Sequence, residues 1–116
     1  MKAKNSIKKN AGFVNKFLKK ELKGNPKQLY DAASHLILHG GKRLRPFLVL
    51  KSCQMLGGRQ SNAIVAASAV EMIHNFTLVH DDIMDNDEMR HGVPTTHKKF
   101  DMPLAILAGD VLYSKA

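Results

Sequence analysis

Hydrophobic residues recur at helical spacing over most of the chain. In residues 6–23 they fall near three- and four-residue steps and so share one helix face: Ile7, Phe13, Val14, Phe17, Leu18 and Leu22. Gly24 is expected to end this first helix. Asn25 is typical of a helix cap and Pro26 of a first helical position, which predicts a second helix to about His39.

Glycine and proline divide the following residues into two more helices. A third helix, with Pro46 near its start, is expected to reach the glycine pair at 57–58. A cap at Ser61 or Asn62 then begins a long fourth helix of small and aliphatic residues. This helix is expected to end at about Asp85.

The segment after the fourth helix is polar. It contains Gly92 and Pro94 and is expected to form a loop, after which a final helix begins near Asp101. No alternating pattern of useful length indicates a β-strand. An all-α fold of antiparallel helices joined by short loops is therefore expected. Because the final helical pattern stops without a glycine, a proline or a cap, the 116 residues are expected to be the front part of a longer domain.

Composition agrees with aliphatic helix packing in a single domain. The chain has 116 residues, of which 44% are hydrophobic and only 6% are aromatic, with no tryptophan. Its one cysteine, Cys53, excludes a disulfide framework and a cysteine-based zinc site. No uninterrupted apolar run has the roughly 18 residues of a membrane span, and the N-terminus lacks the apolar core of a signal peptide. A cytoplasmic location is therefore expected.

The net charge of +8 belongs to the N-terminal segment. Residues 1–27 contain nine lysines and one glutamate, whereas nine basic and nine acidic residues cancel in residues 28–116. We interpret residues 1–27 as a basic, solvated helical segment and residues 28–116 as the all-α domain itself. Attraction to anionic lipid, as a peripheral membrane contact, is one alternative. Nucleic acid is not expected as a partner because no module signature for it is present.

Asp81 and Asp85 carry the strongest chemical signal in the sequence. They lie four positions apart at the end of the predicted fourth helix, so they share one face about one turn apart. Two charged carboxylates at this spacing repel each other unless a cation lies between them. Oxygen ligands without a thiolate suit magnesium or calcium. A sparse pair suits Mg²⁺ better, since this ion completes its shell with water and phosphate oxygens.

Other interpretations of the acidic and histidine pairs fit less well. An EF-hand calcium loop that starts at Asp85 fails because its fifth position is a methionine. A merely solvated helix end is disfavoured because aspartates at a C-terminus oppose the helix dipole. Glu71 and His74 have the spacing of a di-iron motif, but no second copy is present. His35 and His39 are interpreted as a partly exposed helix face rather than as a zinc pair.

Basic residues flank the carboxylate pair in the sequence. Lys42, Arg43 and Arg45 lie between two glycines and a predicted helix start, where the helix dipole favours anions, although the motif is not a P-loop. Arg90 and His91 follow the aspartates in the polar loop. Two basic clusters around a metal-binding pair predict a site for at least one diphosphate. The apolar helices beside it suggest a substrate with a hydrocarbon tail.

Three segments resemble the trans-type isoprenyl diphosphate synthases. They are GGKRLRPFLVL at 40–50, EMIHNFTLVHDDIMDNDEMRHGVPTTHKKF at 71–100 and LAILAGD at 104–110. The resemblance covers about residues 28–116 and implies an all-α bundle of the isoprenoid synthase type around a deep apolar cavity, usually as a homodimer. It also implies a prenyltransferase reaction: Mg²⁺-assisted loss of diphosphate from an allylic diphosphate, then attack by the double bond of isopentenyl diphosphate and loss of a proton.

The resemblance further implies roles for the matching residues at the allylic diphosphate. Asp81 and Asp85 match its magnesium ligands, with Asp82 in support of them. Arg90 matches a contact to the same diphosphate. The family's second aspartate-rich motif and later lysine and glutamine contacts have no counterpart in the 116 residues, so half of a metal cluster is expected here.

For isopentenyl diphosphate, the resemblance implies contacts from Lys42, Arg43 and His74. The chain departs from the family at His91, where a second arginine is usual. Histidine is only partly charged near neutral pH, so a diphosphate there is expected to be held more weakly or in a pH-dependent way.

Phe76 and Thr77 are the candidates for control of product length. The hydrocarbon tail is expected to grow from Asp81 back towards the start of the fourth helix. Thr77 is small and lies on the same face, whereas Phe76 is bulky and lies about 7.5 Å from Asp81 along the axis. This pattern resembles the members that form geranylgeranyl diphosphate. Ordinary core packing of Phe76 is the alternative.

The sequence therefore predicts part of a prenyltransferase that forms geranylgeranyl diphosphate, completed by a homo-oligomer or by a complementary C-terminal half. The alternative is a non-catalytic helical module or partner subunit that binds magnesium diphosphate without turnover.

Overall fold

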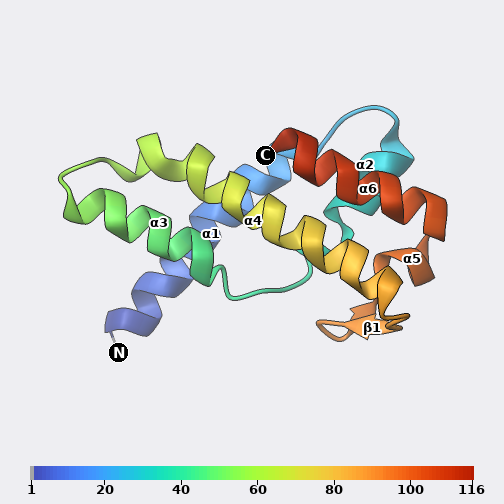
Figure 1. The fold of residues 1–116 in the computed structure, drawn as a ribbon. Coiled ribbons are helices and arrows are strands. Elements are labelled where there is room, and N and C mark those ends of the chain that lie inside the picture. The colour runs from blue at the N-terminus through green and yellow to red at the C-terminus, as the bar shows by residue number, and fades with distance from the viewer. Residues whose placement is uncertain (1) are drawn as a thin grey trace.

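The structure, a computed structural model, describes residues 2–116, and the side chains of residues 4–116. The predicted all-α architecture is confirmed, with one small hairpin added (Figure 1). The elements, in chain order, are α1 (Lys2–Glu21), α2 (Lys27–Ile37), α3 (Leu44–Met55), α4 (Gln60–Met84), β1 (Met89–Arg90), β2 (Val93–Pro94), α5 (Thr96–Lys99) and α6 (Met102–Lys115).

The long helix α4 is the centre of the bundle. Its most extensive contacts are with α3 and α6, and α1 and α2 also pack against it. In Figure 1 it runs across the whole molecule, and the short hairpin and α5 lie near its C-terminal end. By length and composition alone α4 could cross a membrane, as could the core helix of many folded domains. Here it is the element on which the other helices of the described chain assemble.

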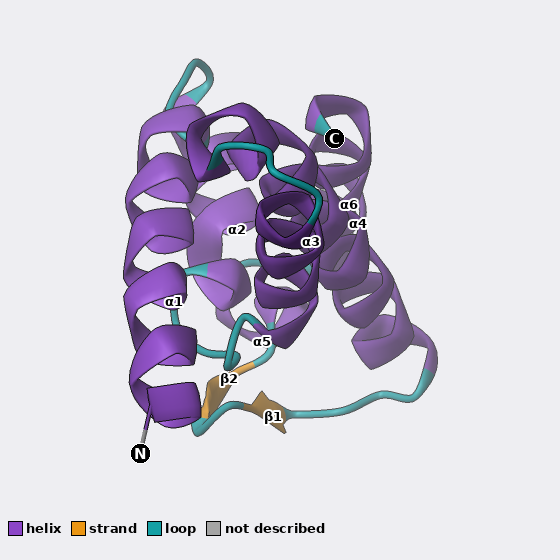
Figure 2. Ribbon diagram, turned by 90° about the vertical axis from the view of Figure 1, so that its left-hand side faces the viewer, coloured by secondary structure: helices purple, strands orange, loops and turns teal. Residues whose placement is uncertain are grey.

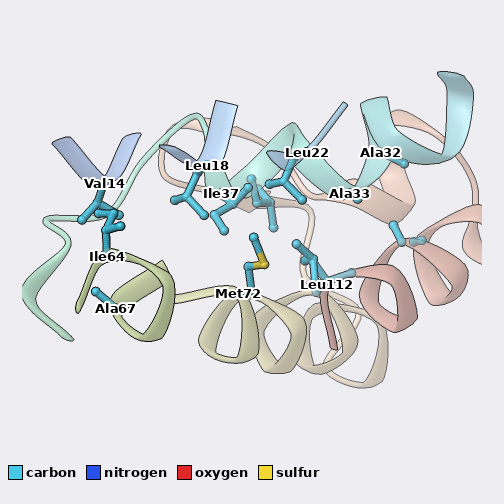
Figure 3. Packing of buried hydrophobic residues seen from close by; sticks show 14 of the residues in the cluster. Val14, Leu18, Leu22, Ala32, Ala33, Ile37, Ile64, Ala67, Met72 and Leu112 are labelled. Atoms are coloured by element: carbon cyan, nitrogen blue, oxygen red, sulfur yellow. The ribbon is translucent and has the colours of Figure 1, made fainter. Parts of the chain in front are cut away.

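The hydrophobic core lies between α1, α2, α4 and α6. Val14 and Leu18 of α1 face Ile64 and Met72 of α4, and Leu112 of α6 lies beside them (Figure 3). Several core positions carry alanine, which lets neighbouring helix backbones approach closely: Ala32, Ala33, Ala63, Ala67, Ala105 and Ala108. The apolar spacing read from the sequence is thus the spacing that packs α1 onto α4.

Helix ends agree with the sequence to within a few residues, but the capping residues differ. Pro26 itself is the N-cap of α2, and Arg59 rather than Ser61 or Asn62 precedes the first residue of α4. The last helix begins near Asp101 as predicted, and the Asp101 side chain caps it by accepting a hydrogen bond from the Leu104 amide at 2.8 Å. Packing of the apolar face, rather than local capping, sets the other two helix starts.

The predicted polar loop contains a β-hairpin. β1 and β2 pair antiparallel, with Met89 opposite Pro94 and Arg90 opposite Val93. His91 and Gly92 form the two-residue turn with φ angles of 54° and 76°, the positive pair that a type I′ turn requires. The expectation of no strand was wrong here, because strands of two residues are too short to show an alternating pattern. The hairpin lies at one end of the bundle (Figure 2).

The bundle leaves much apolar surface uncovered. The described chain measures 44 × 29 × 19 Å, the shape of a slab rather than of a sphere. Leu44 and Leu48 on α3 and Val70 and Ile73 on α4 are exposed to between 38% and 57%. Within residues 2–116, no element covers these side chains.

Candidate functional site

The candidate site lies where the C-terminal end of α4 meets the hairpin and the loop between α2 and α3. Asp81 and Asp85 are both exposed there. The Asp85 amide donates to the Asp81 carbonyl oxygen at 2.8 Å, so the backbone stays helical as far as Asp85. The two carboxylates therefore share one face of α4 about one turn apart, as the sequence predicts.

Asp82 points the other way and holds the hairpin. Its side chain is fully buried and accepts from Arg90 Nε at 2.9 and 3.0 Å and from Arg90 Nη2 at 2.7 Å. The Asp82 carbonyl oxygen also accepts from the Asp87 amide at 2.9 Å. The buried Asp82 carboxylate therefore holds the Arg90 side chain in place. It does not lie on the exposed face of α4 that carries Asp81 and Asp85.

Arg90 remains part of the open site although Asp82 holds it. Its side chain keeps 28% exposure. The hydrogen bonds to Asp82 raise the pKa of Arg90 above its usual value, and the charges of Asp82, Asp87 and Asp81 act in the same direction. The result is a permanently charged, pre-oriented guanidinium beside the aspartate pair.

Arg43 is buried inside the protein. Only 3% of it is exposed, and Nε donates to Asn15 Oδ1 at 2.6 Å while Nη2 donates to the Ile37 carbonyl oxygen. Its Nη1 lies 3.7 Å from Glu71 Oε1. Burial lowers the pKa of Arg43, and the nearby Glu71 charge opposes that shift. In this structure Arg43 ties α1, α2 and α4 together, and it is buried whereas Lys42 is exposed.

Arg45, in the first turn of α3, is the basic residue that contacts His74. Its Nη1 lies 3.2 Å from His74 Nε2, and both Lys42 and Arg45 are exposed. Burial lowers the pKa of His74, with a further contribution from Arg45. Because an arginine can only donate, the His74 nitrogen accepts and the ring is neutral. The family resemblance assigned no role to Arg45. Its contact with His74 becomes apparent only in the structure, where α3 begins at Leu44 and includes Arg45.

His91 connects the hairpin to the glycine loop. A Cβ built on Gly40 would lie 2.5 Å from His91 Cγ, so the ring packs directly on the Gly40 backbone. Gly40, Gly41, His74 and His91 also line one small cavity together with Arg43. The structure therefore brings His74 and His91 to one place, as the sequence predicts.

Phe76 and Thr77 point to different sides of α4. The Phe76 ring is partly buried and packs 4.8 Å from the His80 ring and 5.2 Å from the Tyr113 ring of α6, measured between centroids. Thr77 is exposed, and its hydroxyl donates to the His74 carbonyl oxygen at 2.6 Å. Thr77 lies on the uncovered face that leads to Asp81, whereas Phe76 faces α6.

The donor set fits a metal ion that needs few protein ligands. Within the described residues, no group of three or more His, Cys, Asp or Glu side chains is arranged to hold a metal ion. Two exposed carboxylates one turn apart do suit Mg²⁺, which usually takes one or two carboxylates and leaves its other positions to water and phosphate. They do not suit a closed calcium or zinc site.

Comparison with known proteins places these residues in a family. The family described as polyprenyl synthetase matches residues 26–116. The geranylgeranyl diphosphate synthase of Saccharolobus solfataricus is 54% identical over 103 residues, which cover 89% of this chain and 31% of the relative. The geranylgeranyl pyrophosphate synthase of Geoglobus acetivorans is 55% identical over 111 residues, 95% of this chain and 35% of the relative.

Solved structures agree with the fold. The geranylgeranyl pyrophosphate synthetase of Geoglobus acetivorans superposes with a TM-score of 0.90 at 55% identity, covering 94% of this chain and 36% of that one. The enzyme of Pyrococcus horikoshii gives 0.91 at 48% identity, with 97% and 35% covered. The chain thus spans about a third of the length of the relatives it matches. The chain belongs to the polyprenyl synthetase family.

Proposed function

We propose that this chain carries the diphosphate-binding part of a prenyltransferase that joins an allylic diphosphate to isopentenyl diphosphate. The observation that carries the proposal is the buried carboxylate of Asp82, which holds the partly exposed Arg90 near enough to Asp81 for their charges to interact. A buried acid that orients a cation next to two exposed acids suits an anionic ligand bound through a metal ion.

The allylic diphosphate is proposed to bind at the end of α4. Asp81 and Asp85 would hold Mg²⁺, and Arg90 would contact the diphosphate directly. When bound, the metal ion supplies positive charge that stabilises the leaving diphosphate. Arg90 contributes in the same way, and it costs no reorganisation because Asp82 already holds it in place.

Isopentenyl diphosphate is proposed to bind at the glycine loop. His74 and His91 line the small cavity at this loop, Arg45 contacts His74, and Lys42 is exposed beside them in the sequence. Arg43, which the resemblance assigns here, would have to leave the buried Glu71 to reach a ligand. We therefore assign its contact to Arg45 and give Arg43 the task of holding the loop.

The proposed reaction needs these two headgroups side by side. The allylic C–O bond breaks and its electron pair leaves with the diphosphate. The double bond of isopentenyl diphosphate attacks the allylic carbocation and forms a C–C bond, and loss of a proton restores a double bond. The apolar face of α4, with Val70 and Ile73, would exclude water from the carbocation.

The product is proposed to be geranylgeranyl diphosphate. Thr77 leaves the α4 face beyond Asp81 open to a hydrocarbon tail, and several matched relatives are named geranylgeranyl diphosphate synthases. A second aspartate-rich cluster is needed for a second group of metal ligands. We propose that a complementary C-terminal half carries this second cluster and that the protein assembles as a homo-oligomer in the cytoplasm.

A second candidate function is a partner subunit that binds magnesium diphosphate without turnover. It is favoured by the single pair of exposed carboxylates at the site, since the described residues bring no third ligand to them. One plant relative, 50% identical over 93 residues, is named as the large subunit of a heterodimeric geranylgeranyl pyrophosphate synthase.

Condensation of labelled isopentenyl diphosphate with an allylic diphosphate, by the chain alone and with a complementary C-terminal half, separates the two candidates. Under the first, Asp81→Asn and Asp85→Asn each abolish product, whereas Asp31→Asn, which changes an exposed carboxylate on α2, leaves the rate unchanged. Product formation at the original rate by either site variant contradicts the metal assignment. Under the second candidate no product forms, and calorimetry still detects binding of Mg²⁺ with inorganic diphosphate.

A further inference from the structure

The hairpin has a second attachment, on the strand that pairs with the strand of Arg90. His35 of α2 is 5% exposed, and its Nε2 lies 2.7 Å from the Pro94 carbonyl oxygen, a contact between residues 59 positions apart. A carbonyl oxygen can only accept, so His35 Nε2 carries the proton and donates it. Pro94 has no amide proton, so this carbonyl is the only backbone group with which it can form a hydrogen bond.

The His35 ring is held firmly by its surroundings. It packs edge-on against Phe100 at 5.8 Å between centroids and lies 5.2 Å from the His39 ring. The His39 Nδ1 lies 2.6 Å from the His35 carbonyl oxygen, which fixes the two rings relative to each other. A ring packed on two sides directs its N–H at one acceptor with little freedom to turn.

Burial, more than the surrounding charges, lowers the pKa of His35 and keeps the ring neutral near pH 7. Burial lowers the pKa of His35, the hydrogen bond to Pro94 opposes that shift, and the positive charges of Lys99 and His39 lower it further. Asp31 of α2 lines the same surface pocket as His35, His39 and Lys99, and is the acidic group there. The donor is therefore a neutral imidazole with one defined tautomer.

The hairpin base depends on few other contacts outside the pairing of its own strands. Thr95 donates through its hydroxyl to the Asp87 carbonyl oxygen at 2.9 Å and through its amide to the Glu88 carbonyl oxygen at 3.0 Å. Both bonds join the hairpin to itself. The side-chain hydrogen bonds from the described hairpin strands to the helices are Asp82 to Arg90 on the first strand and His35 to Pro94 on the second, and the second strand leads into α5, whose Lys98 and Lys99 amides donate to the Thr95 carbonyl oxygen.

We propose that His35 is a positioning residue that anchors the second strand of the hairpin at Pro94 and so holds Arg90 and His91 at the diphosphate site. Because Arg90 stands opposite Val93, next to Pro94, a shift of the second strand moves the arginine and the turn together. The role of the hairpin in binding a diphosphate rests on the proposed function. The anchoring of the second strand by His35 does not depend on that function.

Amide hydrogen exchange in the intact protein tests the anchoring without reference to activity. In His35→Leu, which fills similar space but has no donor, exchange of the Thr95 amide is expected to rise about three- to tenfold. His35→Gln, whose side-chain amide can donate, is expected to stay near the original rate. Ser34→Ala is the matched control, since the Ser34 hydroxyl donates within α2 to the Asp31 carbonyl oxygen. The Leu104 amide, bonded to Asp101, is expected to exchange equally in all variants.

Kinetics and NMR extend the test. His35→Leu is expected to raise KM for isopentenyl diphosphate several-fold with a smaller change in kcat, and His35→Gln is expected to restore it. Unchanged Thr95 exchange in the leucine variant overturns the proposal. If that variant does not fold, an Nδ1–H tautomer of His35 in the ¹⁵N spectrum of the unaltered protein at pH 7.5 overturns it equally. If Thr95 exchange rises in the leucine variant but the unaltered protein makes no product, the anchoring by His35 is supported and the proposed function is contradicted.

Discussion

The hairpin and the glycine loop each combine an arginine with a buried carboxylate, but they use the pair in opposite ways. In the hairpin the acid, Asp82, is fully buried and the arginine reaches the surface with 28% of its side chain exposed. In the loop the arginine, Arg43, is buried with Glu71, and the neighbouring cations lie outside. Burial of the acid holds a cation that stays partly exposed to solvent, whereas burial of the cation ties it to the interior of the fold.

The largest effect is expected from removing the acid that holds Arg90. Asp82→Ala leaves the guanidinium without its partner and opens a cavity at the base of the hairpin. We expect the free energy of unfolding to fall by about 2–4 kcal/mol, less than for a wholly buried pair because Arg90 still contacts water. Denaturant unfolding measures the loss, and turnover is expected to fall with it.

Arg90→Lys separates charge from geometry in the same pair. Lysine keeps the positive charge but lacks the two-pronged donor that Asp82 accepts. Activity is expected to fall far more than stability. Equal losses in both measurements would contradict a positioning role for Asp82.

Substitutions of Arg43 and Arg45 are expected to give the next largest effects. Arg43→Met strands Glu71 in the interior, so the free energy of unfolding is expected to fall by about 3 kcal/mol. Arg45→Gln removes an exposed cation beside His74 and is expected to leave stability within about 0.5 kcal/mol while KM for isopentenyl diphosphate rises about tenfold. The reverse result, with Arg43 controlling KM alone, would restore the assignment implied by the family resemblance.

Substitutions at the two chain-length candidates are expected to change the product rather than the rate. Thr77→Phe places a ring on the open face of α4 and is expected to shorten the main product by one isoprene unit. Phe76→Ala, which removes packing against His80 and Tyr113, is expected to reduce stability by about 2–4 kcal/mol, since the ring is only partly buried. Chromatography measures the product length of both variants. An unchanged product profile in Thr77→Phe refutes the proposed path of the hydrocarbon tail.

The smallest effect is a pH dependence of stability. The pKa values of His35 and His74 are lowered on folding, so the unfolded chain binds protons first as the pH falls below about 6.5. Their contribution to stability is therefore complete above that pH and is lost as the pH falls through the folded values. Unfolding at pH 7.5 and pH 5.5 measures the slope, which is expected to flatten in a His35→Gln, His74→Gln double variant.

Periodicity was sufficient to predict the helices but not the direction of individual side chains at the site. The first and fourth helices follow from apolar spacing that persists over several turns. The hairpin could not be predicted from alternation, since each strand has two residues; the signal available was His-Gly at a two-residue turn.

The pairing of Asp81 and Asp85 was predictable because it follows from helix geometry alone. The burial of Arg43 and the contact of Arg45 with His74 were not. Arg43 adopts a left-handed backbone conformation with φ of 57°, and this turn sends its side chain inward before α3 begins. Such a conformation depends on what the interior offers, here Glu71, and not on the local sequence.

The contact between Gly40 and His91 has an evolutionary consequence. Since even one methyl group on residue 40 would overlap the imidazole, these two positions constrain each other across the fold. An alanine at 40 should be accepted only together with a smaller side chain at 91. Homologous sequences are therefore expected to show correlated substitution at this pair.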